Sequence, residues 1–191
     1  MQRPITPAVR PATPDDAAAL AAIYRPIVET TTISFEEVAP DAVAMRERVE
    51  KTLASYPWLV AADGNAVLGY AYAGRWRDRA AYRWSVETTA YVAASARGRG
   101  IGTALYGALV RVLDVQGFRR AFAGITLPND ASIALHERAG FTRAGVFRDA
   151  GYKLGRWCDV AWYERPVNEA AGRPAEPIML RDLPRSAWPV L

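Results

Sequence analysis

A glycine-rich basic loop at residues 95–102 most constrains how this chain can fold, because it joins a predicted strand to a predicted helix. Glycines stand at positions 98, 100 and 102, with Arg97 and Arg99 among them. Glycine lets backbone N–H groups turn toward a ligand, and the helix that follows adds the positive end of its dipole. The segment therefore predicts a loop that holds a phosphate group.

Two common nucleotide-binding motifs do not fit this loop. A P-loop requires a lysine before its Ser or Thr, and Gly102-Thr103 lacks that lysine. A dinucleotide fingerprint requires G-x-G-x-x-G and an acidic residue roughly 20 positions later. Here the glycines are spaced evenly by two, and the nearest downstream acid, Asp114, lies within the predicted helix. The loop therefore suits a phosphate ligand of another kind.

The pattern Arg97-x-x-Gly100-x-Gly102 resembles the coenzyme A pyrophosphate loop of the GNAT-type N-acetyltransferases. Residues 127–141 resemble the second half of that family's cofactor site, where an asparagine and a small polar residue contact the cofactor. Asn129 or Asp130 is also a plausible helix N-cap. The resemblance implies acetyl-CoA as co-substrate, held by Ala90, Tyr91, Val92, Arg97, Gly98, Arg99, Gly100, Ile101, Gly102, Thr103, Asn129 and Ser132.

Residues 56–61, 72–92 and 151–160 resemble the phosphinothricin N-acetyltransferases of this superfamily. The resemblance covers about residues 8–166, which we take as the acetyltransferase domain, and leaves 167–191 as a proline-rich tail. It implies an α/β (α+β) GNAT fold, with a twisted, mixed, mostly antiparallel sheet of about six to seven strands and about four helices. The implied reaction acetylates the amino group of a small anionic amino-acid analogue such as L-phosphinothricin. Methionine sulfone or sulfoximine, or a peptide N-terminus, are the alternative acceptors.

Glu87 is the candidate catalytic base. An ammonium has no lone pair, so a base must remove a proton before the nitrogen can attack a thioester. Glu87 lies in a predicted strand between the uncharged segments 84–86 and 88–90, and similar enzymes place a glutamate base there. Burial beside aromatic residues would raise its pKa toward a useful value. The alternative interpretation is an exposed edge-strand residue or an ion pair with an arginine.

His136, the only histidine, is the second catalytic candidate. It stands where many acetyltransferases of the superfamily have a tyrosine that protonates the departing thiolate. The phosphinothricin-type enzymes resemble this chain in having histidine there. A second acid/base, a substrate contact and a structural role all remain open. The resemblance also implies that backbone N–H groups of Tyr91 or Val92 bind the thioester oxygen.

A basic segment around Arg77 and Arg79 is the candidate acceptor site. Two arginines with nearby hydroxyl groups suit a carboxylate and a second anionic group, as phosphinothricin carries. Related enzymes that prefer the sulfone have an apolar residue where this chain has Arg79. The alternative is a solvated basic hairpin. Arg83 and Cys158 depart from the residues common in the closest relatives. The expected acceptor residues are Phe35, Arg77, Asp78, Arg79, Tyr82, Thr88 and Thr89.

Composition agrees with a cytoplasmic enzyme that forms one domain. A chain of 191 residues that is 51% hydrophobic can bury its own core. The excess of 24 Lys and Arg over 20 Asp and Glu is small, which favours anionic small molecules over nucleic acid. No signal peptide or membrane span is predicted, and one histidine and one cysteine predict no metal site. Similar enzymes are homodimers, so the resemblance implies a homodimer.

Hydrophobic periodicity and turn residues predict the order of elements. Thr13-Pro14 opens a first helix, and Gly117 ends the helix that follows the glycine loop. Four prolines after residue 168 predict an extended tail, at positions 174, 177, 184 and 189. The other expected helices cover 41–54 and 131–139, and the strands 57–62, 66–76, 82–93, 119–127, 142–154 and 157–166.

Overall fold

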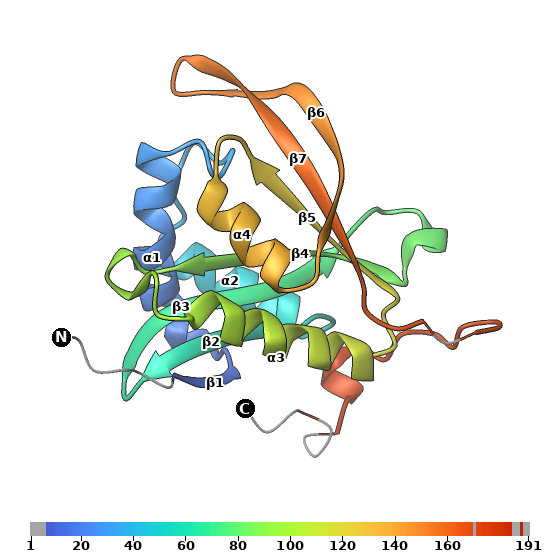
Figure 1. The fold of residues 1–191 in the computed structure, drawn as a ribbon. Helices are drawn as coiled ribbons and strands as arrows, with labels where there is room; N and C mark the ends of the chain where they lie inside the picture. Colours follow the sequence, from blue (N-terminus) through green and yellow to red (C-terminus); the bar gives the residue numbers. More distant parts are fainter. Residues whose placement is uncertain (1–6, 170, 185–187, 189–191) are drawn as a thin grey trace.

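A single seven-stranded sheet organises the computed structural model, which describes residues 7–169, 171–184 and 188. The strand order is β1-β2-β3-β4-β5-β7-β6, and only β4 and β5 pair in parallel (Figure 1). The predicted mixed, mostly antiparallel sheet of six to seven strands is therefore confirmed. The strands are β1 (Ala8–Pro11), β2 (Trp58–Asp63), β3 (Ala66–Arg75), β4 (Ser85–Val92), β5 (Arg120–Thr126), β6 (Thr142–Lys153) and β7 (Arg156–Pro166).

Helices cover both faces of this sheet. On one face, α1 (Ala17–Thr30) and α2 (Ala42–Leu53) share a buried cluster with the aromatic residues of β2 and β3. On the other face, α3 (Ile101–Val115) packs its leucines against small and aliphatic strand residues, and α4 (Asp130–Arg138) lies beyond it (Figure 1). Full burial of one leucine stabilises a fold by about 1.5–3 kcal/mol, so the buried leucines of α3 hold this helix against the sheet.

β4 begins later than the sequence pattern predicts. Residues 82–84 were expected in the strand, but a 3-10 turn occupies Ala80–Tyr82 and β4 starts at Ser85. Arg83 closes the turn, because its backbone N–H and its Nη1 both donate to the carbonyl oxygen of Ala80, at 3.1 and 2.8 Å. The prediction of a strand at Tyr82 was therefore wrong, and Tyr82 sits in an exposed connection between β3 and β4.

β4 and β5 separate after a short paired stretch. Their parallel register covers only Ser85↔Arg120, Val86↔Ala121 and Glu87↔Phe122. Beyond this point β4 continues along β3, and β5 continues along β7. The carboxyl ends of two parallel strands therefore diverge in the middle of the sheet, where polar backbone groups need another partner.

The described part of the proline-rich tail was expected to be extended, but it contains a 3-10 turn at Leu180–Asp182, and it is attached to the domain. The N–H of Ile178 donates to the carbonyl oxygen of Gln116 at 2.8 Å, and the N–H of Leu180 donates to that of Ser55 at 3.2 Å. Leu180 and Leu183 are buried. The tail thus lies between the ends of α2 and α3. The rest of the predicted tail, at 170, 185–187 and 189–191, falls outside the described residues.

Candidate active site

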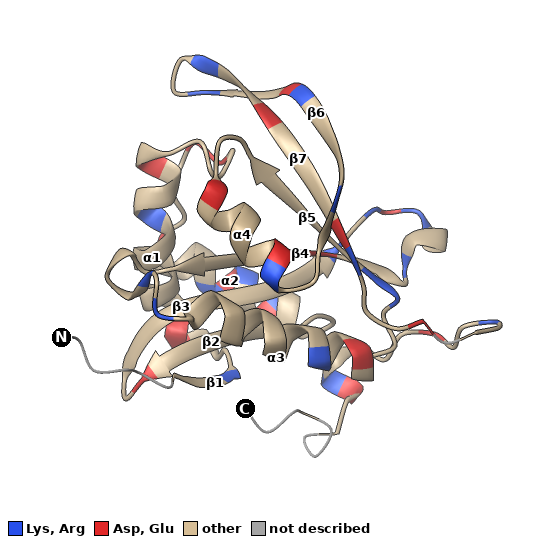
Figure 2. Ribbon diagram, viewed as in Figure 1, with Lys and Arg blue, Asp and Glu red and all other residues tan. Residues whose placement is uncertain are grey.

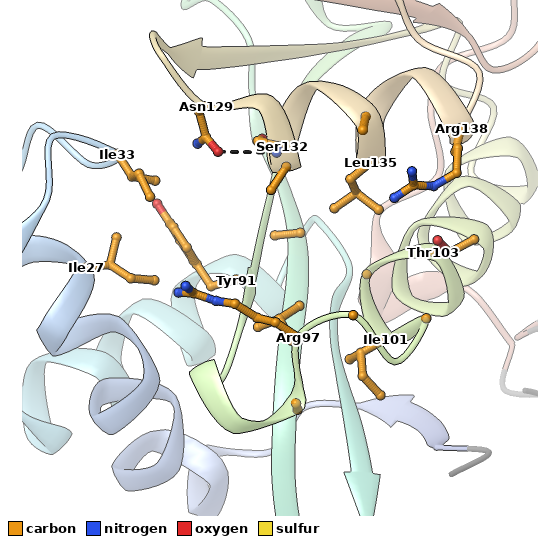
Figure 3. Close-up of a pocket in the computed structure, with 18 residues that line it drawn as sticks. Ile27, Ile33, Tyr91, Arg97, Ile101, Thr103, Asn129, Ser132, Leu135 and Arg138 are labelled. Carbon is orange, nitrogen blue, oxygen red and sulfur yellow. Dashed lines mark hydrogen bonds between the residues drawn. The ribbon is translucent and has the colours of Figure 1, made fainter. Parts of the chain in front are cut away.

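A cavity of about 640 Å³ opens where β4 and β5 diverge (Figure 3). Its walls are the end of β4, the glycine loop, the first turn of α3 and one face of α4. All the predicted coenzyme A residues except Arg99 line it. Arg99 is half-buried outside this lining. The fold therefore brings together the two chain segments that the sequence pattern linked.

The three glycines of the loop serve two different purposes. Gly98 and Gly100 have φ angles of 72° and 79°, which non-glycine residues rarely adopt. A Cβ at either position would meet no atom within 4 Å, so conformation and not space requires glycine there. Gly102 is helical, and a Cβ on it would come within 2.8 Å of the Leu135 side chain. Gly102 therefore permits α3 and α4 to pack closely, which the sequence pattern did not indicate.

The cavity is built for an anion at its glycine-loop end. The first N–H groups of a helix have no intrahelical acceptors, and α3 points this end at the cavity. Arg97 and Arg138 add guanidinium groups from opposite sides (Figure 3). No Asp or Glu is among the described residues of the lining. This end of the cavity therefore favours phosphate groups, as the loop predicted.

Arg138 is a lining residue that the sequence analysis missed. It lies on the face of α4 formed by positions 131, 134, 135 and 138, all of which line the cavity. The spacing i, i+3, i+4, i+7 marks one face of a helix. The small side chains of Ala131 and Ala134 on that face leave room for a ligand, so helical periodicity alone could have indicated Arg138.

Asn129 caps α4 at the edge of the same cavity. Its Oδ1 accepts a hydrogen bond from the N–H of Ser132 at 3.2 Å (Figure 3). The capping role considered from sequence is therefore real. Both residues also line the cavity, which leaves the side-chain amide of Asn129 and the hydroxyl of Ser132 beside the space for a ligand.

Glu87 stands where β4 and β5 part. It pairs across the sheet with Gly74 on β3 and with Phe122 on β5, so it lies in the centre of the sheet and not at an edge. Its side chain is half-buried, and its carboxylate forms no ion pair or hydrogen bond with the described residues. Burial raises the pKa of Glu87, and the positive charge of Arg77 partly offsets this rise. The geometry suits a group that must accept a proton.

Aromatic side chains surround Glu87 on its face of the sheet. The ring of Trp76 stacks on that of Phe122 with centroids 4.4 Å apart. On the other side, the rings of Trp58 and Tyr72 stack at 4.3 Å. These two form part of the floor of a second cavity, of about 660 Å³, which α2 covers. Gly74, the cross-strand partner of Glu87, also lines this second cavity.

The predicted acceptor residues are only partly brought together. Arg77, Arg79 and Tyr82 are exposed on the connection between β3 and β4, a segment rich in basic residues (Figure 2). The Arg77 guanidinium lies 4.3 Å above the Trp76 ring. Asp78 is the member of the set that lines the second cavity. The connection thus carries its charges beside Glu87 without closing over it.

Thr88 and Thr89 point to opposite faces of β4. Thr89 shares the face of Glu87, since residues i and i+2 of a strand lie on one side. Thr88 is buried on the other face, and its hydroxyl donates to the carbonyl oxygen of Phe122 at 3.1 Å. The structure therefore brings Thr89, and not Thr88, to the side of the candidate base.

Phe35 is held against β6 by a buried lysine. Lys153 Nζ donates to the carbonyl oxygens of Val28 and Ser34, at 2.6 and 2.7 Å. The Phe35 ring lies directly over Gly151, where a Cβ would collide with it. Lys153 belongs to a segment that carried the subfamily resemblance, but the sequence indicated no role for it. It ties the end of α1 to the hairpin of β6 and β7.

His136 lies on α4, where it is buried, and it is not part of the described cavity lining. Its Nδ1 lies 2.7 Å from the carbonyl oxygen of Ser132, and its Nε2 lies 2.7 Å from the hydroxyl of Tyr106. A carbonyl only accepts, so Nδ1 carries the proton and Nε2 accepts from Tyr106. Burial lowers the pKa of His136 and raises that of Tyr106. Tyr106 is a neighbour that the sequence analysis did not identify.

Comparison with known families decides the class of this protein. The family model described as an acetyltransferase (GNAT) domain matches residues 9–162. The chain belongs to the GNAT acetyltransferase family.

Individual relatives of this acetyltransferase support the predicted subfamily. It is 40% identical to the phosphinothricin N-acetyltransferase of Streptomyces viridochromogenes, over 93% of this chain and 96% of that protein. It is 37% identical to the L-methionine sulfoximine/L-methionine sulfone acetyltransferase of Pseudomonas aeruginosa, over 87% and 98%. The crystal structure of a phosphinothricin acetyltransferase from Sinorhizobium meliloti, in complex with acetyl-CoA, superposes with a TM-score of 0.85 at 39% identity. That match covers 90% of this chain and 95% of that one. The resemblance inferred from the motifs is confirmed.

The described residues contain neither a cluster of metal ligands nor a helix that could span a membrane. No group of three or more His, Cys, Asp or Glu in them is arranged to hold a metal ion. Across the same part of the chain, every helix is too short or too polar to cross a membrane.

Proposed function

We propose that this acetyltransferase transfers the acetyl group of acetyl-CoA to the amino group of a small anionic amino-acid analogue, of which L-phosphinothricin fits best. The observation that carries the proposal is the position of Glu87. A half-buried carboxylate without a bonding partner among the described residues stands where β4 and β5 part. It lies on the same strand as Ala90, three residues later, where the lining of the cavity suited to a phosphate ligand begins.

Acetyl-CoA fits the cavity between β4 and α4. The first turn of α3, with Arg97 and Arg138, would bind the diphosphate through N–H groups and charge. Past the point where β5 diverges, the Ala90–Val92 backbone would bond to the pantetheine arm as an added strand does. The relative from Sinorhizobium meliloti, which binds acetyl-CoA, shares this fold at 39% identity.

Glu87 acts as the base in a direct transfer. The acceptor enters as an ammonium, and Glu87 removes one proton, directly or through a water molecule. The nitrogen lone pair then attacks the thioester carbonyl carbon to give a tetrahedral intermediate. When this intermediate collapses, the C–S bond breaks, the nitrogen loses its second proton to become an amide, and the leaving thiolate takes up that proton. The raised pKa of Glu87 brings a carboxylate closer to the pKa that proton transfer near neutral pH requires. Cys158 is buried outside the described cavity linings, which supports transfer without an acyl-enzyme.

His136 supports this reaction indirectly, through its hydrogen bond with Tyr106. Its two ring nitrogens are engaged by Ser132 and Tyr106, so it fixes the direction of the Tyr106 hydroxyl. The acid/base role predicted from sequence would require one of these bonds to break during turnover.

The acceptor binds on the face of β4 that carries Glu87. Arg77 and Arg79 supply two cations for the carboxylate and the phosphinate, and Thr89 and Tyr82 supply hydroxyl groups. Phe35 covers the far side. Methionine sulfone or sulfoximine is the second candidate, favoured by the 37% identity to the Pseudomonas aeruginosa enzyme.

We also propose that the enzyme is a homodimer joined through the β6–β7 hairpin. The hairpin projects from the rest of the molecule (Figure 1) and exposes large apolar side chains. These are Phe147, Tyr152, Leu154 and Trp157, which are 55–62% exposed. Apolar patches of this kind mark protein interfaces. Light scattering after gel filtration should give twice the mass of the monomer. The Trp157→Glu variant should give the mass of a single monomer.

Thiol release from acetyl-CoA tests the function. Purified protein is assayed with L-phosphinothricin, methionine sulfone, methionine sulfoximine, ordinary amino acids and a short peptide. We expect the highest kcat/KM with phosphinothricin, and product confirmed by mass spectrometry. Turnover restricted to the sulfone and sulfoximine would support the second candidate, and turnover of the peptide alone would reject the acceptor assignment.

A further inference from the structure

The connection between β3 and β4 is fixed at both of its ends. At the β3 end, Trp76 stacks on Phe122 and meets Trp162 edge-on, with ring centroids 4.4 and 4.7 Å apart. At the β4 end, Arg83 and Trp84 are held by the C-terminal tail. The residues between these ends, 77–82, are exposed and include Arg79 and Tyr82.

The tail holds Arg83 through a two-point ion pair. Arg83 Nε donates to Oε2 of Glu176 at 2.6 Å, and Nη2 donates to Oε1 at 2.8 Å. Next to it, the indole N–H of Trp84 donates to the carbonyl oxygen of Ala175 at 2.7 Å. Paired bonds between a guanidinium and a carboxylate fix orientation as well as distance. The base of the connection therefore has a defined position relative to the tail.

The position of Glu176 is set by Ile178, two residues further along the chain, which is hydrogen-bonded to the buried Gln116. Gln116 is fully buried at the end of α3. Its side-chain Nε2 donates to the carbonyl oxygens of Ile178 and Ser55, at 2.8 and 3.0 Å, and its backbone carbonyl oxygen accepts from the N–H of Ile178. These bonds join the tail to the body of the domain. The core therefore fixes the position of Glu176, and Glu176 in turn fixes the position of Arg83.

Arg83 passes this restraint to the turn that follows Arg79. Its Nη1 donates to the carbonyl oxygen of Ala80 at 2.8 Å, and its guanidinium lies 3.9 Å above the Trp84 ring. The same turn is closed by a bond from the N–H of Tyr82 to the carbonyl oxygen of Arg79, at 3.0 Å. One guanidinium thus connects the tail to the turn that places Arg79 and Tyr82.

We propose that Glu176 is a positioning residue for the acceptor site, acting through Arg83 on the turn at 79–82. The proposal rests on the proposed function, in which Arg79 and Tyr82 contact the acceptor. Arg83 and Glu176 are 42% and 69% exposed. An exposed pair adds little to global stability, so its effect is to restrict the connection to the conformation that receives substrate.

A double-mutant cycle tests this coupling. Arg83→Ala, Glu176→Ala and the double variant are compared with Glu169→Ala, a control at an exposed glutamate that the structure pairs with none of the described residues. We expect each single variant to raise the acceptor KM about three- to fivefold, and the double variant no further. The KM for acetyl-CoA and the Tm should stay unchanged. Additive effects, or equal effects on both substrates, would overturn the proposal.

Hydrogen exchange separates this inference from the proposed function. In Glu176→Ala we expect faster exchange at the amides of Tyr82 and Arg83, with no change in α3 or in the control variant. If the wild type acetylates no amino-acid acceptor but these amides respond, the proposed function fails and the restraint on the turn stands. If acetylation is normal and these amides exchange at the wild-type rate, the role of Glu176 is rejected by itself.

Discussion

Glu87 and Phe122 form the last residue pair that β4 and β5 share before the two strands separate. The pairing places a carboxylate and an aromatic ring side by side at the narrow end of the gap. Two polar groups at this point need a bonding partner. The backbone beyond it must find a new hydrogen-bond partner, and the carboxylate beside it lacks a partner among the described residues.

Replacing Glu87 with Gln should remove the base while keeping the shape of the site. We expect kcat to fall by about 10²- to 10⁴-fold, with the Kd for acetyl-CoA unchanged in calorimetry. Glu137→Gln, on the exposed side of α4, is the matched control. Wild-type turnover in Glu87→Gln would show that another group accepts the proton.

The rate should depend on pH through the same carboxylate. A base acts only when deprotonated, and burial raises the pKa of Glu87, so kcat/KM should rise with pH through a midpoint above the ordinary glutamate value of about 4.3. Glu87→Gln should lose this limb of the profile. Because Arg77 opposes the rise, Arg77→Ala should move the midpoint to higher pH. A shift in the other direction would contradict the charge interaction.

Arg97 and Arg138 should matter for the coenzyme, and Arg99 should not. Loss of a charge-assisted hydrogen bond to a phosphate weakens binding by about tenfold or more. We therefore expect Arg97→Ala and Arg138→Ala each to raise the KM for acetyl-CoA by about that factor, without changing the acceptor KM. Arg99→Ala is the matched control, since Arg99 lies outside the cavity lining. Initial-rate kinetics with each substrate varied in turn distinguish these outcomes.

Gly100, at the start of α3, and Gly107, in its middle, should respond oppositely to substitution by alanine. Gly100 has a φ of 79°, so Gly100→Ala forces a side chain into the left-handed region and should lower the free energy of unfolding by about 1 kcal/mol or more. Gly107 lies within α3, where a Cβ would meet nothing within 4 Å, so Gly107→Ala should raise it by about 0.5–1 kcal/mol. Urea denaturation measures both. Equal effects would mean that the loop conformation differs in solution.

His136 should remain neutral where an ordinary histidine is half protonated. Burial lowers its pKa, so the unfolded state binds the proton more readily, and this residue's contribution to stability is lost as pH falls below about 6.5. NMR of the single histidine ring should show an Nδ1–H tautomer at pH 6. Tyr106→Phe leaves Nε2 buried without its donor and should cost about 1–3 kcal/mol. Tyr56→Phe, at a hydroxyl that bonds no described residue, is the control.

Local patterns predicted most of the fold. The glycine loop, the helix caps and the alternating strands indicated the elements in their correct order, and the loop with Asn129 indicated which two segments meet at the cavity. These features depend on neighbours in the chain, so a sequence displays them directly. Strand alternation also separates Thr88 from Thr89, which the acceptor prediction did not use.

What the sequence could not reveal depends on contacts between distant segments. The turn at Ala80–Tyr82 takes the place of the start of the strand predicted at 82–93, because Arg83, which closes the turn, is held by Glu176, 93 residues away in the chain. The roles of Lys153 and Tyr106 depend likewise on the end of α1 and on His136. Propensity is a weak guide where such contacts decide the conformation.

Because β4 and β5 pair over only a short stretch, binding of the coenzyme should change how cooperatively the protein unfolds. Three residue pairs join a half-sheet of β1 to β4 with a half-sheet of β5 to β7. A cofactor that bonds to the free edge of β4 and to α4, which follows β5, would bridge the two halves. Coenzyme binding should therefore unite them into one cooperative unit, so that the protein melts in a single, sharper transition when the cofactor is bound.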